Sequence, residues 1–193
     1  MDAQELLGKN REHAQSPEEK ELLLLAIDAL WFVWRNGQTY EFESYRKDVA
    51  SEAPPRVIAS FSTRDEAEVW VKARPQSPDL ALVLIADEYH VVLSSRDEQR
   101  RALVPDMAMG YHIEEMTRNG LPPVVATFNT RDEADVWFRS QSEPPAQTVI
   151  QIGNERYLAV FFQNIQHRAL FPFSVVERLH EIRRRRAQKE AGE

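Results

Sequence analysis

The most constraining feature of this chain is an internal duplication. Residues 61–72, FSTRDEAEVWVK, return sixty-seven positions later as residues 128–139, FNTRDEADVWFR, with eight identities in twelve. The same spacing relates residues 99–105, QRRALVP, to residues 166–172, QHRALFP. Two copies are too few for a solenoid, but a pair can form one pseudo-twofold domain in which each copy covers the apolar face of the other.

Composition places the chain among ordinary soluble proteins with a hydrophobic core. It has 193 residues, of which 42% are hydrophobic and 28% charged. It has no cysteine, which excludes thiol catalysis, disulfide bonds and cysteine-ligated zinc. The first residues also lack the basic start and apolar run of a secretion signal, so we expect a cytoplasmic protein.

The charge of the chain is distributed unevenly. Residues 1–53 hold eleven acidic and six basic residues, whereas residues 121–193 hold nine acidic and ten basic ones. An acidic body argues against a nucleic-acid partner, which needs a positive surface to neutralise phosphates. The basic run Arg183 to Arg186 is explained by the helix dipole, which favours positive charge near a helix C-terminus.

The N-terminal third of the sequence predicts helices. Ser16 and Pro17 form a helix start, and Asn36-Gly37 forms a helix stop. Between them, residues 22–34 are apolar on nearly every face, which predicts a helix buried on more than one side. At about 19 Å this run is too short to cross a membrane, so no membrane partner is expected. If one chain cannot cover it, the helix would instead supply a homodimer interface.

Each copy predicts the order strand, helix, strand, strand. A capping box at Thr63 or Thr130 starts the helix, and two apolar strands follow as a hairpin. The closing Arg-Ala-Leu-x-Pro could form one more short strand. The expected strands are residues 56–61, 80–86 and 89–93 in the first copy, and 148–152 and 157–162 in the second.

Helices are predicted before, between and after the two copies. A helix containing Phe42, Tyr45 and Val49 precedes the first copy, a helix over residues 107–118 precedes the second, and another follows Ser174. The sequence therefore predicts an α+β fold in which tandem βαββ units form a pseudo-twofold antiparallel sheet domain. The expected parts are an N-terminal helical region (1–53), the first repeat with its connecting helix (54–120), the second repeat (121–173) and a C-terminal helix with a basic tail (174–193).

The acidic residues of the repeated helices are candidate partner-binding residues. Clustered carboxylates could attract a basic protein, although acids in a first helical turn also stabilise a helix without any ligand. Trp70 and Trp137 share the helical register of core alanines and are expected to pack in the core. The candidate residues are Asp65, Glu66, Glu68, Asp132, Glu133 and Asp135.

No catalytic, metal or cofactor motif is found in the sequence. His112 with Glu114 and Glu115, and Glu177 with His180, have helical spacings that could place a carboxylate beside an imidazole. One such pair is only part of a di-iron carboxylate site. The sequence also lacks G-x-G-x-x-G, P-loop and G-x-S-x-G motifs. We therefore expect no cofactor and no enzyme, while a dyad assembled from distant residues stays open.

The duplicated motifs carry a resemblance. The segments VIASFSTRDEAEVW and VVATFNTRDEADVW, each with its closing Arg-Ala-Leu-x-Pro, resemble a group of small paralogous myxobacterial proteins, some of them associated with toxin–immunity loci. The similarity covers about residues 17–175 and implies a bacterial protein with a binding role, without assigning any functional residue. The leading hypothesis is an immunity protein that binds a basic toxin. The alternative is a small-ligand sensor or enzyme with its site at the seam between the repeats.

Overall fold

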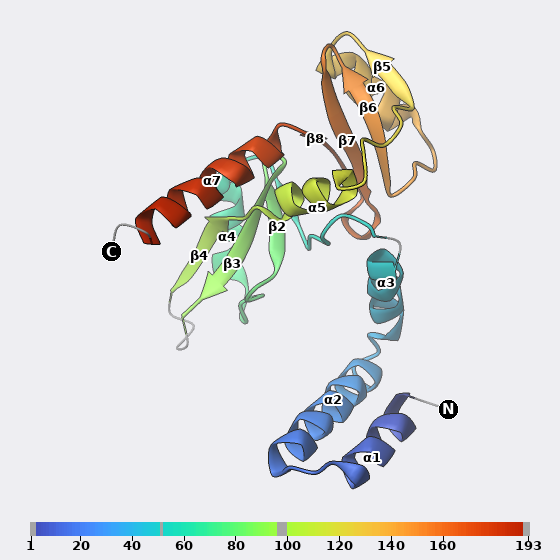
Figure 1. Ribbon diagram of the computed structural model, residues 1–193, viewed down its shortest axis with the longest axis vertical. Coiled ribbons are helices and arrows are strands. Elements are labelled where there is room, and N and C mark those ends of the chain that lie inside the picture. Colours follow the sequence, from blue (N-terminus) through green and yellow to red (C-terminus); the bar gives the residue numbers. More distant parts are fainter. Residues whose placement is uncertain (1–2, 51, 96–99, 191–193) are drawn as a thin grey trace. The chain divides into compact units, whose positions relative to one another are not determined.

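The computed structural model describes residues 3–50, 52–95 and 100–190 (Figure 1). The chain divides into two compact units, residues 1–52 and residues 53–193. The N-terminal unit is helical, with α1 (Ala3–His13), α2 (Pro17–Arg35) and α3 (Thr39–Ala50). The second unit contains the duplicated sequence, and each unit is described by itself below.

Helix α2 begins and ends where the sequence predicts. The Ser16 side chain accepts a hydrogen bond from the backbone N–H of Glu19 at 3.0 Å, and Gly37 takes the left-handed conformation after the last turn. The prediction that this helix is buried is wrong, because none of its residues is buried. In the described part of its unit, α1 and α3 pack against it, which is too little to cover a helix that is apolar on nearly every face.

The second unit holds two four-stranded sheets with the same topology, ordered β1-β2-β3-β4 and β5-β6-β7-β8 (Figure 1). The α+β class is confirmed, and the closing Arg-Ala-Leu-x-Pro forms the fourth strand of each sheet. In the first sheet, β1 (Ser60–Phe61) leads through α4 (Arg64–Ala73) to β2 (Leu82–Ile85), β3 (Glu88–Ser94) and β4 (Arg101–Pro105). In the second, β5 (Ala126–Phe128) leads through α6 (Arg131–Ser140) to β6 (Gln147–Ile152), β7 (Glu155–Phe162) and β8 (His167–Pro172).

The sheets are mixed rather than purely antiparallel. The first strand of each sheet pairs in parallel with the second, with Ser60 opposite Leu84 and Ala126 opposite Ile150. The remaining pairs are antiparallel. The physical reason is the intervening helix, which carries the chain back to the starting end of the sheet before the next strand begins.

Each sheet is covered by its own helix on one face and contributes to a shared core on the other. Helix α4 lies against the first sheet and α6 against the second (Figure 1). Ala67 and Val71 of α4 pack on the first sheet, and Ala134 and Phe138 of α6 pack on the second. The opposite faces meet in a third cluster that draws on both sheets and on the next helix. Its buried residues are Val57, Leu84, Tyr89, Met109, Ile113, Val149, Leu158, Val160, Phe162, Ala169 and Phe171. Each copy thus buries the apolar face of the other.

Two helices complete the duplication. Helix α5 (Ala108–Thr117) follows the first sheet, and α7 (Val175–Glu190) follows the second. A short 3-10 turn, η1 (Gln163–Ile165), connects β7 to β8 within the second sheet. The helices α5 and α7 begin sixty-seven residues apart, which is the spacing of the two sequence copies. Each copy therefore extends from its first strand to the end of one of these helices. The two helices pack on each other at Gly110, where an added Cβ would lie 3.4 Å from the Cβ of Leu179.

Candidate functional site

The six acidic residues proposed from the sequence lie on α4 and α6, which cover different sheets. Glu66 accepts hydrogen bonds from the backbone N–H groups of Ser62 and Thr63 at 3.0 and 3.3 Å. Glu133 accepts one from the N–H of Asn129 at 2.9 Å. These two carboxylates cap their own helices, as the structural interpretation of the motif requires.

The other four acids are divided between ion pairs and open surface. Arg64 and Lys72 bind Glu68 at 3.1 and 3.4 Å, and the hydrogen bond from Arg64, followed by that from Lys72, lowers the pKa of this carboxyl. Asp135 lies 3.9 Å from Arg131 of its own helix. Asp65 and Asp132 are exposed in the first turns of α4 and α6. Among the six, these two acids present the most available negative charge.

Trp70 and Trp137 pack at the edges of the two helix-covered cores. Trp70 lies edge-on to Phe61 at a centroid distance of 5.2 Å, with the Arg74 guanidinium 4.0 Å above its ring. Trp137 lies 5.3 Å from Phe128, the residue equivalent to Phe61. Both indoles are half-buried and occupy the same place in their copies, as a role in packing predicts.

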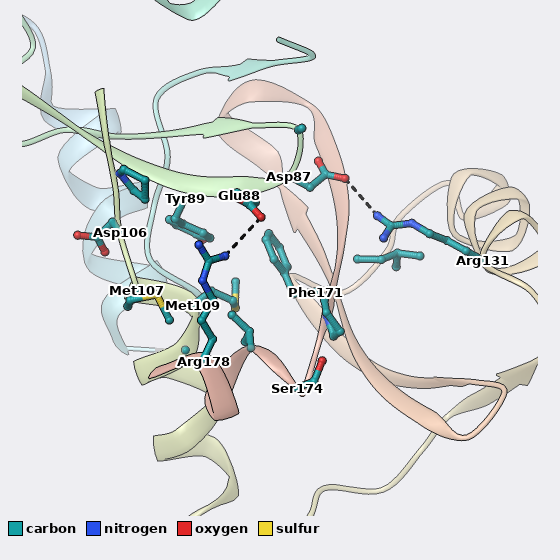
Figure 2. A pocket seen from close by; sticks show the side chains of 16 residues that line it. Asp87, Glu88, Tyr89, Asp106, Met107, Met109, Arg131, Phe171, Ser174 and Arg178 are labelled. Atoms are coloured by element: carbon teal, nitrogen blue, oxygen red, sulfur yellow. Dashed lines mark hydrogen bonds and ion pairs between the residues drawn. The ribbon is translucent and has the colours of Figure 1, made fainter. Parts of the chain in front are cut away.

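A pocket of about 380 Å³, here called the seam pocket, lies between the two copies (Figure 2). This volume falls within the range of small-ligand sites. Its walls come from the β2–β3 turn, the end of β4, α5, the start of α6, the end of β8 and the start of α7. The main lining side chains are Asp87, Glu88, Tyr89, Met107, Met109, Arg131, Leu170, Phe171, Val175 and Arg178.

Ion pairs between the copies cross the rim of the seam pocket. Arg131 lies 3.4 Å from Asp87, and Arg178 lies 3.6 Å from Glu88 (Figure 2). Asp87 occupies a turn in which Ala86 and Asp87 both have positive φ, at 48° and 60°. A non-glycine residue adopts this conformation at a cost, so the fold holds the carboxylate of Asp87 at the seam in a strained turn.

The floor of the seam pocket is formed by aromatic rings, and the phenol of Tyr89 among them cannot act as a general base. The rings of Tyr89 and Phe171 lie 5.7 Å apart, and the Tyr89 hydroxyl donates to the carbonyl of Pro55 at 2.8 Å. Burial raises the pKa of Tyr89 well above its ordinary value, so this phenol stays protonated at physiological pH. The pocket therefore offers an apolar surface with charged groups at its mouth.

Ser60, His167 and Asp87 meet at the seam in a cluster that the sequence did not predict. His167 Nε2 lies 2.9 Å from an Asp87 carboxylate oxygen and 3.3 Å from the Ser60 hydroxyl. In a Ser-His-Asp relay, the acid holds one imidazole nitrogen while the other takes the proton from serine. Here the same nitrogen faces both groups, so the cluster joins the two copies without forming that relay.

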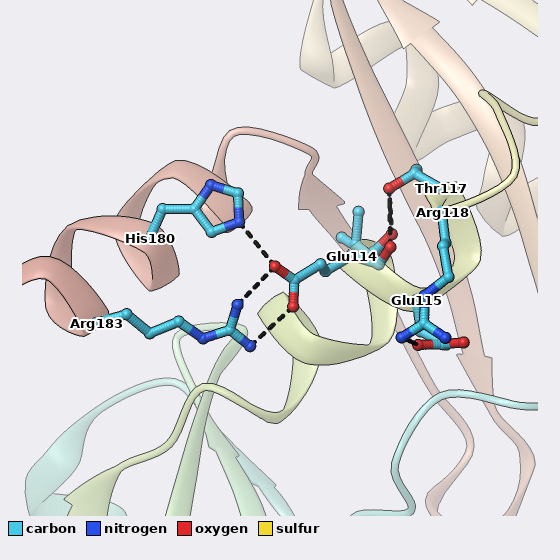
Figure 3. A network of polar contacts seen from close by, with 7 residues as sticks. Glu114, Glu115, Thr117, Arg118, His180 and Arg183 are labelled. Atoms are coloured by element: carbon cyan, nitrogen blue, oxygen red, sulfur yellow. Dashed lines mark hydrogen bonds and ion pairs between the residues drawn. The ribbon is translucent and has the colours of Figure 1, made fainter.

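Helices α5 and α7 are joined by an ionic clamp, defined by Glu114, His180 and Arg183 (Figure 3). The Arg183 guanidinium donates to both Glu114 carboxylate oxygens at 2.7 and 2.8 Å, and His180 Nε2 lies 2.7 Å from one of them. The hydrogen bonds from Arg183 and then from His180 lower the pKa of Glu114. The histidine and glutamate that the sequence singled out on separate helices thus lie within hydrogen-bond distance of each other.

Neutralising the clamp is expected to change how stability depends on pH. Because the folded-state pKa of Glu114 lies below its ordinary value of 4.5, its stabilisation is complete above about pH 4.5 and is lost as pH falls through the lower folded pKa. Glu114→Gln should therefore lower the melting temperature at pH 7, and its difference from wild type should shrink as the pH is lowered from 4.5 toward 3. Thermal unfolding between these pH values measures this.

The matched control for the clamp is Glu115→Gln. Glu115 pairs with Arg118, the residue directly after α5, so its replacement should have little effect at any pH (Figure 3). A constant difference between Glu114→Gln and wild type from pH 7 to pH 3 would show that the charge of Glu114 does not stabilise the packing of the two helices.

Comparisons with known proteins found no match to a family model, to a curated protein or to a solved structure. Among the described residues, no group of three or more histidine, aspartate or glutamate side chains is arranged to hold a metal ion. No helix in the described part of the chain has the length and apolar character needed to span a membrane.

Proposed function

We propose that this chain is a non-enzymatic cytoplasmic protein-binding module, most concretely a bacterial immunity protein that neutralises a basic toxin. The observation that carries the proposal is the exposed face of α3 formed by Tyr45 and Val49, within the acidic N-terminal unit. Tyr45 is 49% exposed and Val49, one helical turn later, is 60% exposed, so the two side chains lie on the same side of the helix. Exposed tyrosines among charged residues are typical of the hot spots of protein interfaces.

Charge supports a basic partner. Eleven acidic and six basic residues lie in the first 53 positions, and Glu41 lies one helical turn before Tyr45 on α3. A negative surface accelerates association with a positive partner and makes that association sensitive to salt. The capping and pairing of Glu66, Glu68, Glu133 and Asp135 leave α3 as the better docking surface. Asp65 and Asp132 could add to the steering.

Binding to the product of a neighbouring gene tests the proposal. Isothermal titration calorimetry should give a stoichiometric complex that weakens with added salt, and co-expression should protect cells from that product. Tyr45→Ala combined with Val49→Asp should weaken binding by roughly 10- to 100-fold, because it removes an aromatic anchor and places a charge in the interface.

Val69→Asp is the matched control for α3. Val69 is 68% exposed on α4, so the substitution adds the same charge on a helix of the second unit. It should leave partner binding unchanged. Equal losses for both variants, or no binding by any neighbouring gene product at low salt, would contradict the proposal.

The seam pocket supports small-ligand binding as a second candidate function. Its apolar floor and charged mouth suit an amphipathic molecule with an apolar body. Val175→Trp, which would fill the pocket, separates the two functions. It should leave protein-partner binding intact if α3 is the docking surface, and should remove ligand-induced thermal stabilisation if the seam pocket is the site.

A further inference from the structure

Helix α2 has an exposed apolar stripe on the face away from its half-buried residues. Leu22, Leu25 and Phe32 are 67%, 65% and 62% exposed, and Ala29 between them is exposed as well. Their spacing of three, four and three residues is that of the a and d positions in a coiled coil. The half-buried Ile27 and Trp31 lie on the opposite side of the helix. The stripe therefore has the pattern of a helix face that packs against a second helix.

Charges along one flank of this stripe specify the direction of the partner helix. Glu21, Asp28 and Arg35 recur every seven residues beside the stripe, negative at the start of α2 and positive at its end. An antiparallel copy of α2 brings Arg35 of each chain to Glu21 of the other. A parallel copy would place these residues opposite the uncharged Ala26 and Val33, so only the antiparallel arrangement uses both charges.

We propose that a second copy of this chain covers the α2 stripe, with the two α2 helices antiparallel about a twofold axis. Leu22 of each copy packs against Phe32 of the other, and Leu25 packs against Ala29. Asp28 meets its own equivalent near the axis. This dimer rests on the proposed function only in that both use the N-terminal unit as an interaction surface. It leaves α3 free to bind the toxin.

Charge exchange in the full-length chain tests the antiparallel arrangement. Sedimentation equilibrium at low salt should show a dimer for the wild type. Glu21→Arg and Arg35→Glu should each weaken self-association on the order of tenfold, since each replaces two attractive contacts per dimer by two repulsive ones. The double variant E21R/R35E restores both pairs at unchanged net charge, and its dissociation constant should return to within about threefold of wild type.

Two further substitutions probe the stripe and the axis. Leu25→Asp should weaken the dimer by roughly 100-fold or more, because it buries a charge at the centre of the interface between the two α2 helices. Val69→Asp should again have no effect. Asp28→Asn should tighten the dimer by a few-fold, since it removes a like-charge contact at the axis. If a basic protein covered the stripe instead, Asp28→Asn would weaken binding.

The outcomes separate this proposal from the function. A wild-type chain that stays monomeric at about 100 μM, roughly the concentration at which a weak specific dimer forms, would overturn the proposal, as would a double variant as weak as its parents. A monomer that still binds the neighbouring gene product would leave the function standing. A chain that dimerises but binds no neighbouring gene product would contradict the immunity function and support the proposed α2 dimer.

Discussion

Replacing Phe138 by alanine is expected to lower the free energy of unfolding of the second unit by about 3–5 kcal/mol. Phe138 is 2% exposed and is among the largest fully buried side chains of the described chain. It fills the space between α6 and the second sheet, where it packs with Ala134, Ile150 and Leu170. Truncation removes its apolar contacts and leaves a cavity that the sheet cannot close, because the strands are fixed by their ladder. Urea denaturation measures the loss.

Val136→Ala is the matched control for Phe138. Val136 belongs to the same helix and is 71% exposed, so its truncation should change the free energy of unfolding by less than about 0.5 kcal/mol. If both substitutions had equal effects, α6 would not be packed on the second sheet through Phe138.

Leu158→Ala is expected to cost about 2–5 kcal/mol, and its effect should reach the first copy as well as the second. Leu158 is fully buried in β7, in the core that both sheets share. Because Leu84 and Tyr89 of the first sheet belong to that core, its loss should destabilise both copies together. Amide hydrogen exchange of Leu84, whose N–H donates to Ala59, should accelerate by roughly 30-fold or more if it exchanges through global unfolding.

Leu93→Ala serves as the control for Leu158. Leu93 lies on β3 and is 38% exposed, so its truncation should cost much less than that of Leu158. Exchange that accelerates only in the second sheet of Leu158→Ala would mean that the two copies open independently.

The duplication made most of the fold predictable. Local signals placed the helix starts at Ser16, Thr63 and Thr130, since capping depends on residues that are neighbours in the chain. Short runs of apolar and β-branched residues likewise located the strands, although β1 is only two residues long. The burial of α2 could not be predicted from its composition, because burial depends on how much other chain is present to cover it.

The residues at the seam were missed because nothing local marks them. Asp87, Arg131 and His167 come from distant parts of the chain and meet only when both copies are folded. Comparison of the copies holds a signal that could have found one of them. His167 corresponds to Arg100 within the closing motif, where five of the seven residues of 99–105 and 166–172 are identical. The clamp was closer to prediction, since Glu114 and His180 had each been singled out.

The shared core has a consequence for synthesis on the ribosome. The last strand of the first copy ends at Pro105, and its equivalent in the second copy ends sixty-seven residues later at Pro172. At the usual elongation rate of about 5–20 residues per second, the apolar face containing Leu84 and Tyr89 waits roughly 3–13 s for the strands that cover it. During that interval the nascent chain presents one uncovered sheet. A chaperone that binds apolar strands would find its substrate there, and two neighbouring nascent chains on one messenger could exchange halves.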